Sequence, residues 1–174
     1  KLPQNTVDLI YVDPPYALTQ SKWDEALDWD LLWPMLWKIV KPHGKIIVHS
    51  SSHFTQQMMS LKYFRYRWFW NKQRHTNHLN ASIQPLRVME EICVFYKTVK
   101  GGVYHPPSID TETRVITSGS RYSSVYNKNQ AGTNMTKEYT GRTPVDLLTF
   151  LSKKDEMKPY DLINFIISIK GGST

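Results

Sequence analysis

The sequence predicts an α/β fold: a doubly wound, mostly parallel sheet with an antiparallel pair at one edge. Short apolar runs alternate with segments of helical apolar spacing over the first hundred residues, which is the rhythm of such sheets. Two later strand-like runs are separated only by a long loop, residues 71–89, which indicates an antiparallel pair. With 174 residues, of which 40% are hydrophobic, the chain suits one domain with its own core.

The first expected strand is residues 6–13, "TVDLIYVD", an apolar run of the kind found in buried strands. After a loop, Asp30 is the expected cap of a helix that ends at "KPHG", residues 41–44, since proline and glycine stop helices. Pro34 fits this helix only near its first turn. A second buried strand is expected at residues 45–49. One apolar face of this helix consists of Leu32, Met35, Leu36 and Ile39. A second face consists of Trp29, Trp33 and Trp37, four residues apart, and this face is expected in the core.

The later elements are a short helix near residues 55–61 and strands at 64–70 and 90–97. Residues 98–142 are rich in Gly, Ser, Thr, Asn and Tyr and show no clear period, which predicts loops or an inserted segment. Order returns in residues 143–174, where the chain is expected to rejoin the α/β core. The last expected helix has Pro159 just inside its start. Its apolar residues have helical spacing: Leu162, Ile163, Phe165, Ile166 and Ile169.

Positive charge is concentrated in the middle of the chain. The net charge is +7, and residues 62–100 hold eight basic residues against two acidic ones, interleaved with aromatic side chains. This composition favours a polyanionic partner, nucleic acid first. A solvated strand face backed by packed aromatic rings explains the same pattern equally well.

Several other classes of protein are disfavoured. No apolar run approaches the roughly 20 residues that span a bilayer, so no membrane partner is expected, and the first residues lack a secretory layout. The single cysteine, Cys93, excludes an internal disulfide framework and agrees with a reducing cytoplasm. The histidines have no cysteine partners, so no metal site is expected.

The most informative segment is the DPPY segment, residues 13–16, at the carboxyl end of the first strand. In open α/β sheets ligands bind beyond such strand ends. The two prolines remove backbone donors, so a primary amine could donate to the Asp13 carboxylate and to the Pro14 carbonyl, with Tyr16 as a flat surface beside it. This arrangement suits adenine or cytosine. The alternative is a strand-ending turn whose aspartate caps a neighbouring segment.

In its order of motifs the chain resembles the DNA amino-methyltransferases, which act on N6 of adenine or N4 of cytosine with S-adenosylmethionine. The matching segments, which cover most of the chain outside about 98–141, are "VDLIYVDPPY", "WKIVKPHGKIIVHSS", "WFWNKQRHTNHLNASIQPLRVMEEICVFYK", "TPVDLLTF" and "KPYDLINFII". The order is similar to the permuted group, in which the catalytic half precedes the cofactor-binding half. The resemblance implies the fold of S-adenosylmethionine-dependent methyltransferases.

The resemblance also implies roles for the matching residues. The DPPY segment would form the catalytic target-base pocket, where Asp13 and Pro14 take the amine hydrogens and Pro15 and Tyr16 complete the wall. The methyl group would pass directly from sulfonium to nitrogen, with proximity and alignment as the main source of acceleration. Aspartate at the first position favours adenine over cytosine. Contacts to the cofactor S-adenosylmethionine are expected from Asp13, His49, Ser50, Ser51, Lys158 and Pro159.

The partner that the resemblance implies is double-stranded DNA with a flipped adenine, in the cytoplasm and nucleoid of a bacterial or phage-infected cell. Residues 98–142 occupy the usual place of a target-recognition region. Basic and amide side chains of the loop and of this region are the expected DNA contacts: Lys72, Arg74, His78, Asn80, Arg87, Arg121, Lys128 and Arg142. For His78 and Asn80, capping of the loop's own backbone is an equal alternative.

One departure from the family concerns the Gly-rich cofactor loop, which should follow the Lys158 helix; the chain ends there in "KGGST". We therefore expect a partial version of the enzyme: a fragment, one half of a split enzyme completed by a complementary chain, or a shortened relative that no longer methylates. A homodimer, a noncatalytic DNA-binding remnant and an RNA amino-methyltransferase stay open as alternatives.

Overall fold

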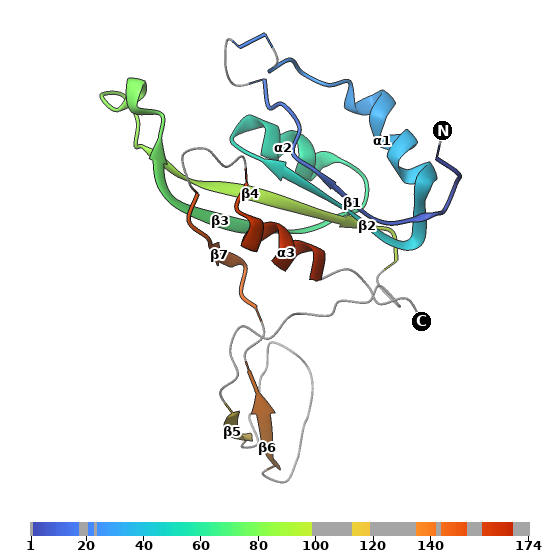
Figure 1. Ribbon diagram of the computed structural model, residues 1–174, viewed down its shortest axis with the longest axis vertical. Helices are drawn as coiled ribbons and strands as arrows, with labels where there is room; N and C mark the ends of the chain where they lie inside the picture. Colours follow the sequence, from blue (N-terminus) through green and yellow to red (C-terminus); the bar gives the residue numbers. More distant parts are fainter. Residues whose placement is uncertain are drawn as a thin grey trace, which may run out of the picture. The chain divides into compact units, whose positions relative to one another are not determined.

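The computed structural model of the chain describes residues 2–17, 21–22, 24–98, 113–118, 135–141, 144–152 and 158–168. The chain divides into two compact units, one formed by Lys1–His105 with Val145–Thr174 and the other by Pro106–Pro144. The first unit contains the main sheet and its helices (Figure 1). The predicted functional segments other than residues 106–144 therefore belong to a single unit.

The main sheet has five strands in the order β1-β2-β4-β3-β7. These are β1 (Val7–Val12), β2 (Val40–Ser50), β3 (Phe64–Thr76), β4 (Arg87–Tyr96) and β7 (Leu147–Thr149). The pairs β1–β2 and β3–β7 are parallel, whereas β4 is antiparallel to both β2 and β3. Four of the five strands thus run in one direction, and the expected antiparallel pair is confirmed.

The expected position of that pair at the sheet edge is wrong. β4 is the central strand, and β7 adds to the outer side of β3, so neither member of the pair is an edge. Instead β1 is an edge strand, and its residues are partly exposed rather than buried. The apolar run predicted that β1 would be buried. Because a strand at an edge has a neighbour on one side only, the residues of β1 keep part of their surface exposed.

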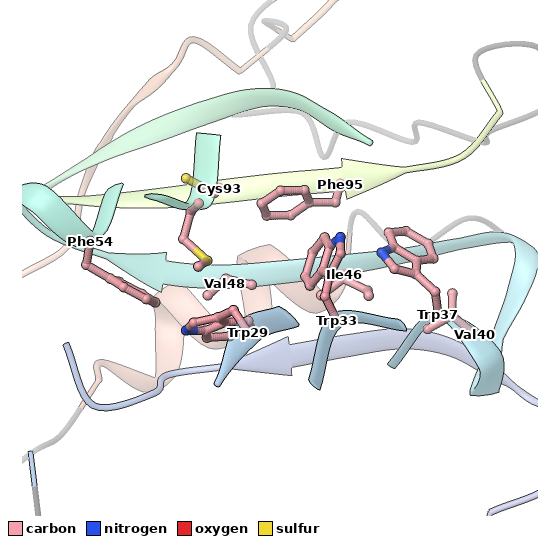
Figure 2. Close-up of a cluster of buried hydrophobic side chains, with 10 residues drawn as sticks. Trp29, Trp33, Trp37, Val40, Ile46, Val48, Phe54, Cys93 and Phe95 are labelled. Atoms are coloured by element: carbon pink, nitrogen blue, oxygen red, sulfur yellow. The ribbon is translucent and has the colours of Figure 1, made fainter. Parts of the chain in front are cut away.

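One face of the sheet is covered by α1 (Trp29–Ile39) and α2 (His53–Ser60). The three tryptophans of α1, four residues apart, are all buried and form edge contacts with one another and with Phe95 of β4 (Figure 2). Each large ring removes on the order of 150–250 Å² of surface from water. The tryptophan prediction is confirmed, and this cluster is the main anchor of α1 on the sheet: Trp29, Trp33 and Trp37.

The cap of α1 differs from the expectation. Asp28, not Asp30, is the N-cap, because its carboxylate accepts a hydrogen bond from the backbone N–H of Leu31 at 3.1 Å. Asp30 lies in the first turn, where a negative charge favours the helix dipole. Pro34 is therefore the sixth helical residue, beyond the first turn.

The expected helix stop "KPHG" is part of β2, which begins at Val40 directly after α1. Gly44 is required there by close packing: a Cβ at this position would lie 2.9 Å from the carbonyl oxygen of Asp8. The glycine therefore permits close approach of β1 and β2.

The opposite face of the sheet is covered by α3 (Tyr160–Ser168), whose Leu162 and Ile166 are fully buried against Trp68 and Trp70 of β3. Because helices lie on both faces, the doubly wound arrangement is confirmed. Pro159 directly precedes the first helical residue, and its carbonyl accepts the Ile163 N–H at 3.1 Å.

The second unit contains an antiparallel pair, β5 (Thr113–Ser118) and β6 (Met135–Thr140). Six residues of each strand pair in register, from Thr113 opposite Thr140 to Ser118 opposite Met135. The sequence predicted only loops or an insertion here, because neither strand has the alternating apolar pattern that would identify it. None of the described helices is long and apolar enough to cross a membrane.

Candidate active site

A pocket of about 660 Å³ lies at the carboxyl end of β1. β1 and β2 are parallel, so the residues that follow them, Asp13 and Ser51, lie at the same edge of the sheet. The other walls come from the β3–β4 hairpin, from Asp24 in the loop after β1, and from Lys158. The lining residues are Asp13, Pro14, Pro15, Tyr16, Asp24, Ser51, Lys72, Thr76, Asn77, Arg87, Met89, Glu90 and Lys158.

The DPPY segment is held in shape by Asp24. This carboxylate is 7% exposed, and its Oδ1 accepts hydrogen bonds from the backbone N–H groups of Tyr16 and Ala17, each at 2.8 Å. Pro14 and Pro15 have no N–H to donate, and the first two backbone donors after these prolines both bind one buried oxygen. Sequence reasoning missed Asp24, since a single aspartate in a loop carries no periodic signal.

Tyr16 contacts both the core and the pocket. Its ring stacks on Phe54 of α2 with centroids 5.4 Å apart and planes 22° apart. Its hydroxyl donates to Oδ1 of Asp13 at 2.8 Å. Burial raises the pKa of the Tyr16 hydroxyl, and the negative charge of Asp13 raises it further, so the hydroxyl stays protonated as a donor.

Glu90, in β4, joins two lysines at the pocket floor. Its Oε2 lies 2.6 Å from Nζ of Lys158, and its Oε1 lies 3.1 Å from Nζ of Lys72. Lys158 also lies 3.4 Å from Oδ1 of Asp13 and 5.2 Å from the Trp70 ring centroid. The two carboxylates and two ammonium groups balance in charge, which is the arrangement that permits partial burial of all four.

His49 lies behind this cluster and is fully buried. Its Nε2 is 2.5 Å from the Tyr11 hydroxyl, and its Nδ1 is 3.9 Å from Oε2 of Glu90. Burial, and then the positive charge of Lys158, lower the pKa of His49 well below its usual value, so the imidazole is neutral. Burial likewise raises the pKa of Tyr11, which keeps its hydroxyl protonated. Within the described part of the chain, Nδ1 has no hydrogen-bond partner.

The predicted cofactor residues divide into two groups. Asp13, Ser51 and Lys158 line the pocket. His49, Ser50 and Pro159 are buried and are not among its lining residues. The Ser50 hydroxyl faces the core, where it accepts a hydrogen bond from Thr55 at 3.1 Å.

The predicted DNA contacts also divide. Lys72 and Arg87 line the pocket, and Lys72 is 7% exposed, so its charge is directed at Glu90 rather than at an outer surface. Arg74 and His78 are exposed on the hairpin. The Asn80 side chain donates to the side-chain oxygen of Asn77 at 2.8 Å, whereas Nε2 of His78 lies 3.1 Å from the backbone carbonyl of His75, the kind of contact that the backbone-capping alternative expects. Three further predicted contacts lie outside the described residues: Arg121, Lys128 and Arg142.

Two members of the site that were not predicted had a signal in the sequence. Tyr11 precedes Asp13 by two residues, so the two side chains share one face of the strand. Glu90 and Lys72 belong to consecutive strands joined by one loop, and such strands pair in antiparallel fashion. Glu90 lies opposite Trp70, so Lys72, two residues further along β3, is its diagonal neighbour, and long side chains of opposite charge can reach one another across such a diagonal.

The fold is similar to that of two solved structures. One is the PvuII DNA methyltransferase, which is cytosine-N4-specific: the TM-score is 0.58 over 99% of this chain and 66% of that chain, with 13% identity. The other is a complex of M1.HpyAVI with SAM: the TM-score is 0.51 over 98% of this chain and 68% of that chain, with 18% identity. The chain therefore spans about two thirds of the length of either structure. The similarity confirms the predicted fold class.

No protein-family model matches the sequence, and no curated protein matches it significantly.

Proposed function

We propose that this chain is the catalytic, base-binding part of a DNA methyltransferase that methylates the exocyclic N6 amine of adenine with S-adenosylmethionine. The observation that carries the proposal is the pocket at the end of β1, in which the DPPY segment meets Glu90 and Lys158. The similarity in fold to a DNA methyltransferase supports it.

The chemistry assigned to the DPPY segment follows from its donors and acceptors. An adenine amine that enters the pocket would donate its hydrogens to the Asp13 carboxylate and to the Pro14 carbonyl, which directs the nitrogen lone pair away from them. In the described structure Oδ1 of Asp13 already accepts the Tyr16 hydroxyl, so binding of an amine would compete with or replace this bond. The rigid prolines and the Asp24 bonds hold the acceptors in place, and such alignment accounts for large rate effects.

S-adenosylmethionine would supply an electrophilic methyl group bound to a sulfonium. Ser51, Glu90 and Lys158 at the pocket could provide polar and charged contacts for the amino-acid end of this cofactor. Gly44 and Gly141 are the glycines among the described residues, and neither forms a glycine-rich turn after a strand, so contacts to the nucleoside end are not assigned to the described part of the chain. As the amine nitrogen bonds to the methyl carbon, the carbon–sulfur bond would break and leave its electron pair on a neutral thioether, and the nitrogen would lose one proton, for which the Asp13 carboxylate is the proposed base.

N4 methylation of cytosine is the second candidate. The specific observation in its favour is the similarity in fold to a cytosine-N4-specific enzyme. Both bases present an exocyclic amine beside a ring nitrogen, so the pocket chemistry suits either. The adenine proposal rests on the aspartate at the first position of the DPPY segment.

The test is a methyl-transfer assay on the full chain with isotopically labelled S-adenosylmethionine and duplex DNA, followed by nucleoside analysis. We expect N6-methyladenine. The variant Asp13→Asn should lose at least about 100-fold in transfer, an effect of the size seen when one aligned polar group is removed, while its affinity for DNA stays within about twofold. N4-methylcytosine as the product would replace the adenine proposal with the cytosine one.

The matched control is Asp8→Asn, on the same strand, where the carboxylate pairs with Lys41 on the surface, 2.8 Å away. This variant should transfer methyl groups like the unmodified chain. Absence of S-adenosylmethionine binding in calorimetry would rule out independent catalysis. Restoration of transfer by a separate chain that carries a Gly-rich cofactor loop would then identify a split enzyme, and failure of restoration would favour a noncatalytic DNA-binding remnant.

A further inference from the structure

The β3–β4 hairpin continues beyond its neighbours to an exposed turn, drawn in green at the upper left of Figure 1. Two large aliphatic side chains lie on this turn. Leu79 is 99% exposed and Ile83 is 79% exposed, the two highest values among the large hydrophobic side chains of the described residues. A leucine and an isoleucine exposed together on one turn leave apolar surface in water, and burial of that surface in a complex would be favourable.

The turn has a defined conformation. Asn77 is left-handed, with φ 73°, and opens a short 3-10 helix, His78–Asn80. Backbone N–H groups of Asn80, Ile83 and Gln84 donate to carbonyls within the turn at 3.0–3.1 Å. Leu79 and Ile83 are therefore presented outward by a hydrogen-bonded turn, so their exposure is a feature of the folded hairpin.

The charge around the turn identifies the kind of partner. Residues 71–89 contain three basic residues and two histidines but no aspartate or glutamate. Arg74, His75 and His78 are exposed. An apolar tip flanked only by basic groups is complementary to a polyanion that also offers an apolar interior, and the stacked bases of a nucleic acid duplex are such an interior.

The base of the same hairpin forms one wall of the candidate active site. Thr76, Asn77 and Arg87, which flank the turn, line the pocket together with Asp13. A duplex that delivers a base to this pocket would therefore have the turn beside it. A base that leaves the stack creates a gap, and apolar side chains enter such gaps in other DNA-binding proteins.

We propose that Leu79 and Ile83 form an apolar wedge that enters duplex DNA next to the extruded base and replaces its stacking. This inference rests on the proposed function, because it takes the pocket as the site that receives the base. It assigns to the hairpin a role in base extrusion, in addition to the phosphate contacts expected of its basic residues.

The test compares duplex and single-stranded substrates of the same sequence at matched salt. In the double variant Leu79→Ala/Ile83→Ala, methyl transfer to the duplex should fall by about tenfold or more, because the gap is no longer filled. Transfer to single-stranded DNA, where nothing has to be extruded, should stay within about twofold. The matched control is Leu31→Ala, which removes a leucine that is 65% exposed on α1 and should change neither rate.

A second measurement does not require methyl transfer. Binding of the unmodified chain to a duplex with one mispaired 2-aminopurine should raise its fluorescence, and the double variant should bind with a smaller rise. If this difference is found but no methyl transfer occurs on any substrate, the wedge stands and the proposed function fails. An equal loss on both substrates, an unchanged duplex rate, or an identical fluorescence rise would overturn the wedge. A change in self-association on sedimentation of the double variant would also overturn it, in favour of a protein interface.

Discussion

At the scale of single residues, the pocket depends on a few polar groups whose environments differ sharply. Glu90 retains two ammonium partners at the pocket floor, whereas His49, a few ångströms behind it, is neutral and fully buried. Lys158 connects the two environments, since it contacts Glu90 and Asp13 and also lowers the pKa of His49. Removal of the Lys158 charge would therefore change the electrostatic environment of Asp13, Glu90 and His49 together.

The neutral His49 makes stability depend on pH. Its pKa in the folded state lies well below the value of about 6.5 expected in the unfolded chain. Since the unfolded state then binds the extra proton, the stability due to the neutral form is present above pH 6.5 and is lost as the pH falls below it. Between pH 6.5 and 5 we expect the free energy of unfolding to fall by up to about 1.4 kcal/mol per pH unit from this group.

Urea denaturation at several pH values measures this effect. His49→Gln should flatten the dependence between pH 5 and 6.5, while His53→Gln, which changes an exposed histidine of α2, should leave it unaltered. A pH dependence that persists in His49→Gln would show that another group is responsible.

At the scale of secondary-structure elements, α1 illustrates how a short helix with an internal proline is maintained. Pro34 removes one backbone hydrogen bond from the helix interior. The Asp28 cap, Asp30 in the first turn and Lys38 in the last turn offset part of this loss, because each charge has the sign that the helix dipole favours. The buried tryptophans supply the tertiary anchor.

The cap can be tested directly. Asp28→Ala removes the acceptor for the Leu31 N–H and should lower the free energy of unfolding by about 1 kcal/mol, within the usual range for N-caps. Asp30→Ala removes only a favourable first-turn charge and should cost about 0.5 kcal/mol or less. The measurement is chemical denaturation of both variants, and an equal or larger loss for Asp30→Ala would contradict the assignment of the cap.

The elements themselves were largely predictable, because their signals are local. The spacing of Trp29, Trp33 and Trp37 gave the buried face of α1, and the apolar spacing around Leu162 gave α3. The choice between Asp28 and Asp30 was not predictable, since both precede the apolar face and only backbone geometry decides. Sheet order was equally inaccessible: β7 has three residues, too few for a pattern, yet it removes β3 from the edge.

The site was predictable in the DPPY segment and, through the resemblance, in Ser51 and Lys158, which also line the pocket. The DPPY segment could be assigned because chain continuity fixes it at a strand end. Glu90 and Phe54 join it from distant parts of the sequence, and their contribution depends on sheet order and helix placement. Ser50 and Ser51 show the same limit, since alternation along the chain places one in the core and the other at the pocket.

At the scale of the whole molecule, the net charge of +7 predicts salt-dependent association with DNA. The affinity for duplex DNA should fall with salt concentration on a log–log plot, as bound cations are released from the phosphates. Arg74 is exposed on the acid-free hairpin, so Arg74→Gln should reduce the magnitude of the slope by about one.

Arg65→Gln is the matched control, because the Arg65 guanidinium donates to the carbonyls of Tyr96 and Lys97 and is occupied within the fold. Fluorescence anisotropy measures both slopes in titrations from about 50 to about 200 mM salt. Equal slopes for Arg74→Gln and the unmodified chain would show that this arginine does not meet a phosphate.

The central, reversed strand of the sheet has a consequence for how the protein opens. β4 is hydrogen-bonded on both sides, and its residues Ile92, Cys93, Val94 and Phe95 are completely inaccessible to solvent. Amides of such a strand exchange with solvent only when the sheet as a whole unfolds. Glu90 belongs to this strand, so the carboxylate that pairs with both lysines of the pocket lies in the part of the sheet that opens last. The hydrogen-bonded turn that presents Leu79 extends from the same persistent strand, so it keeps its place beside the pocket for as long as the sheet is folded.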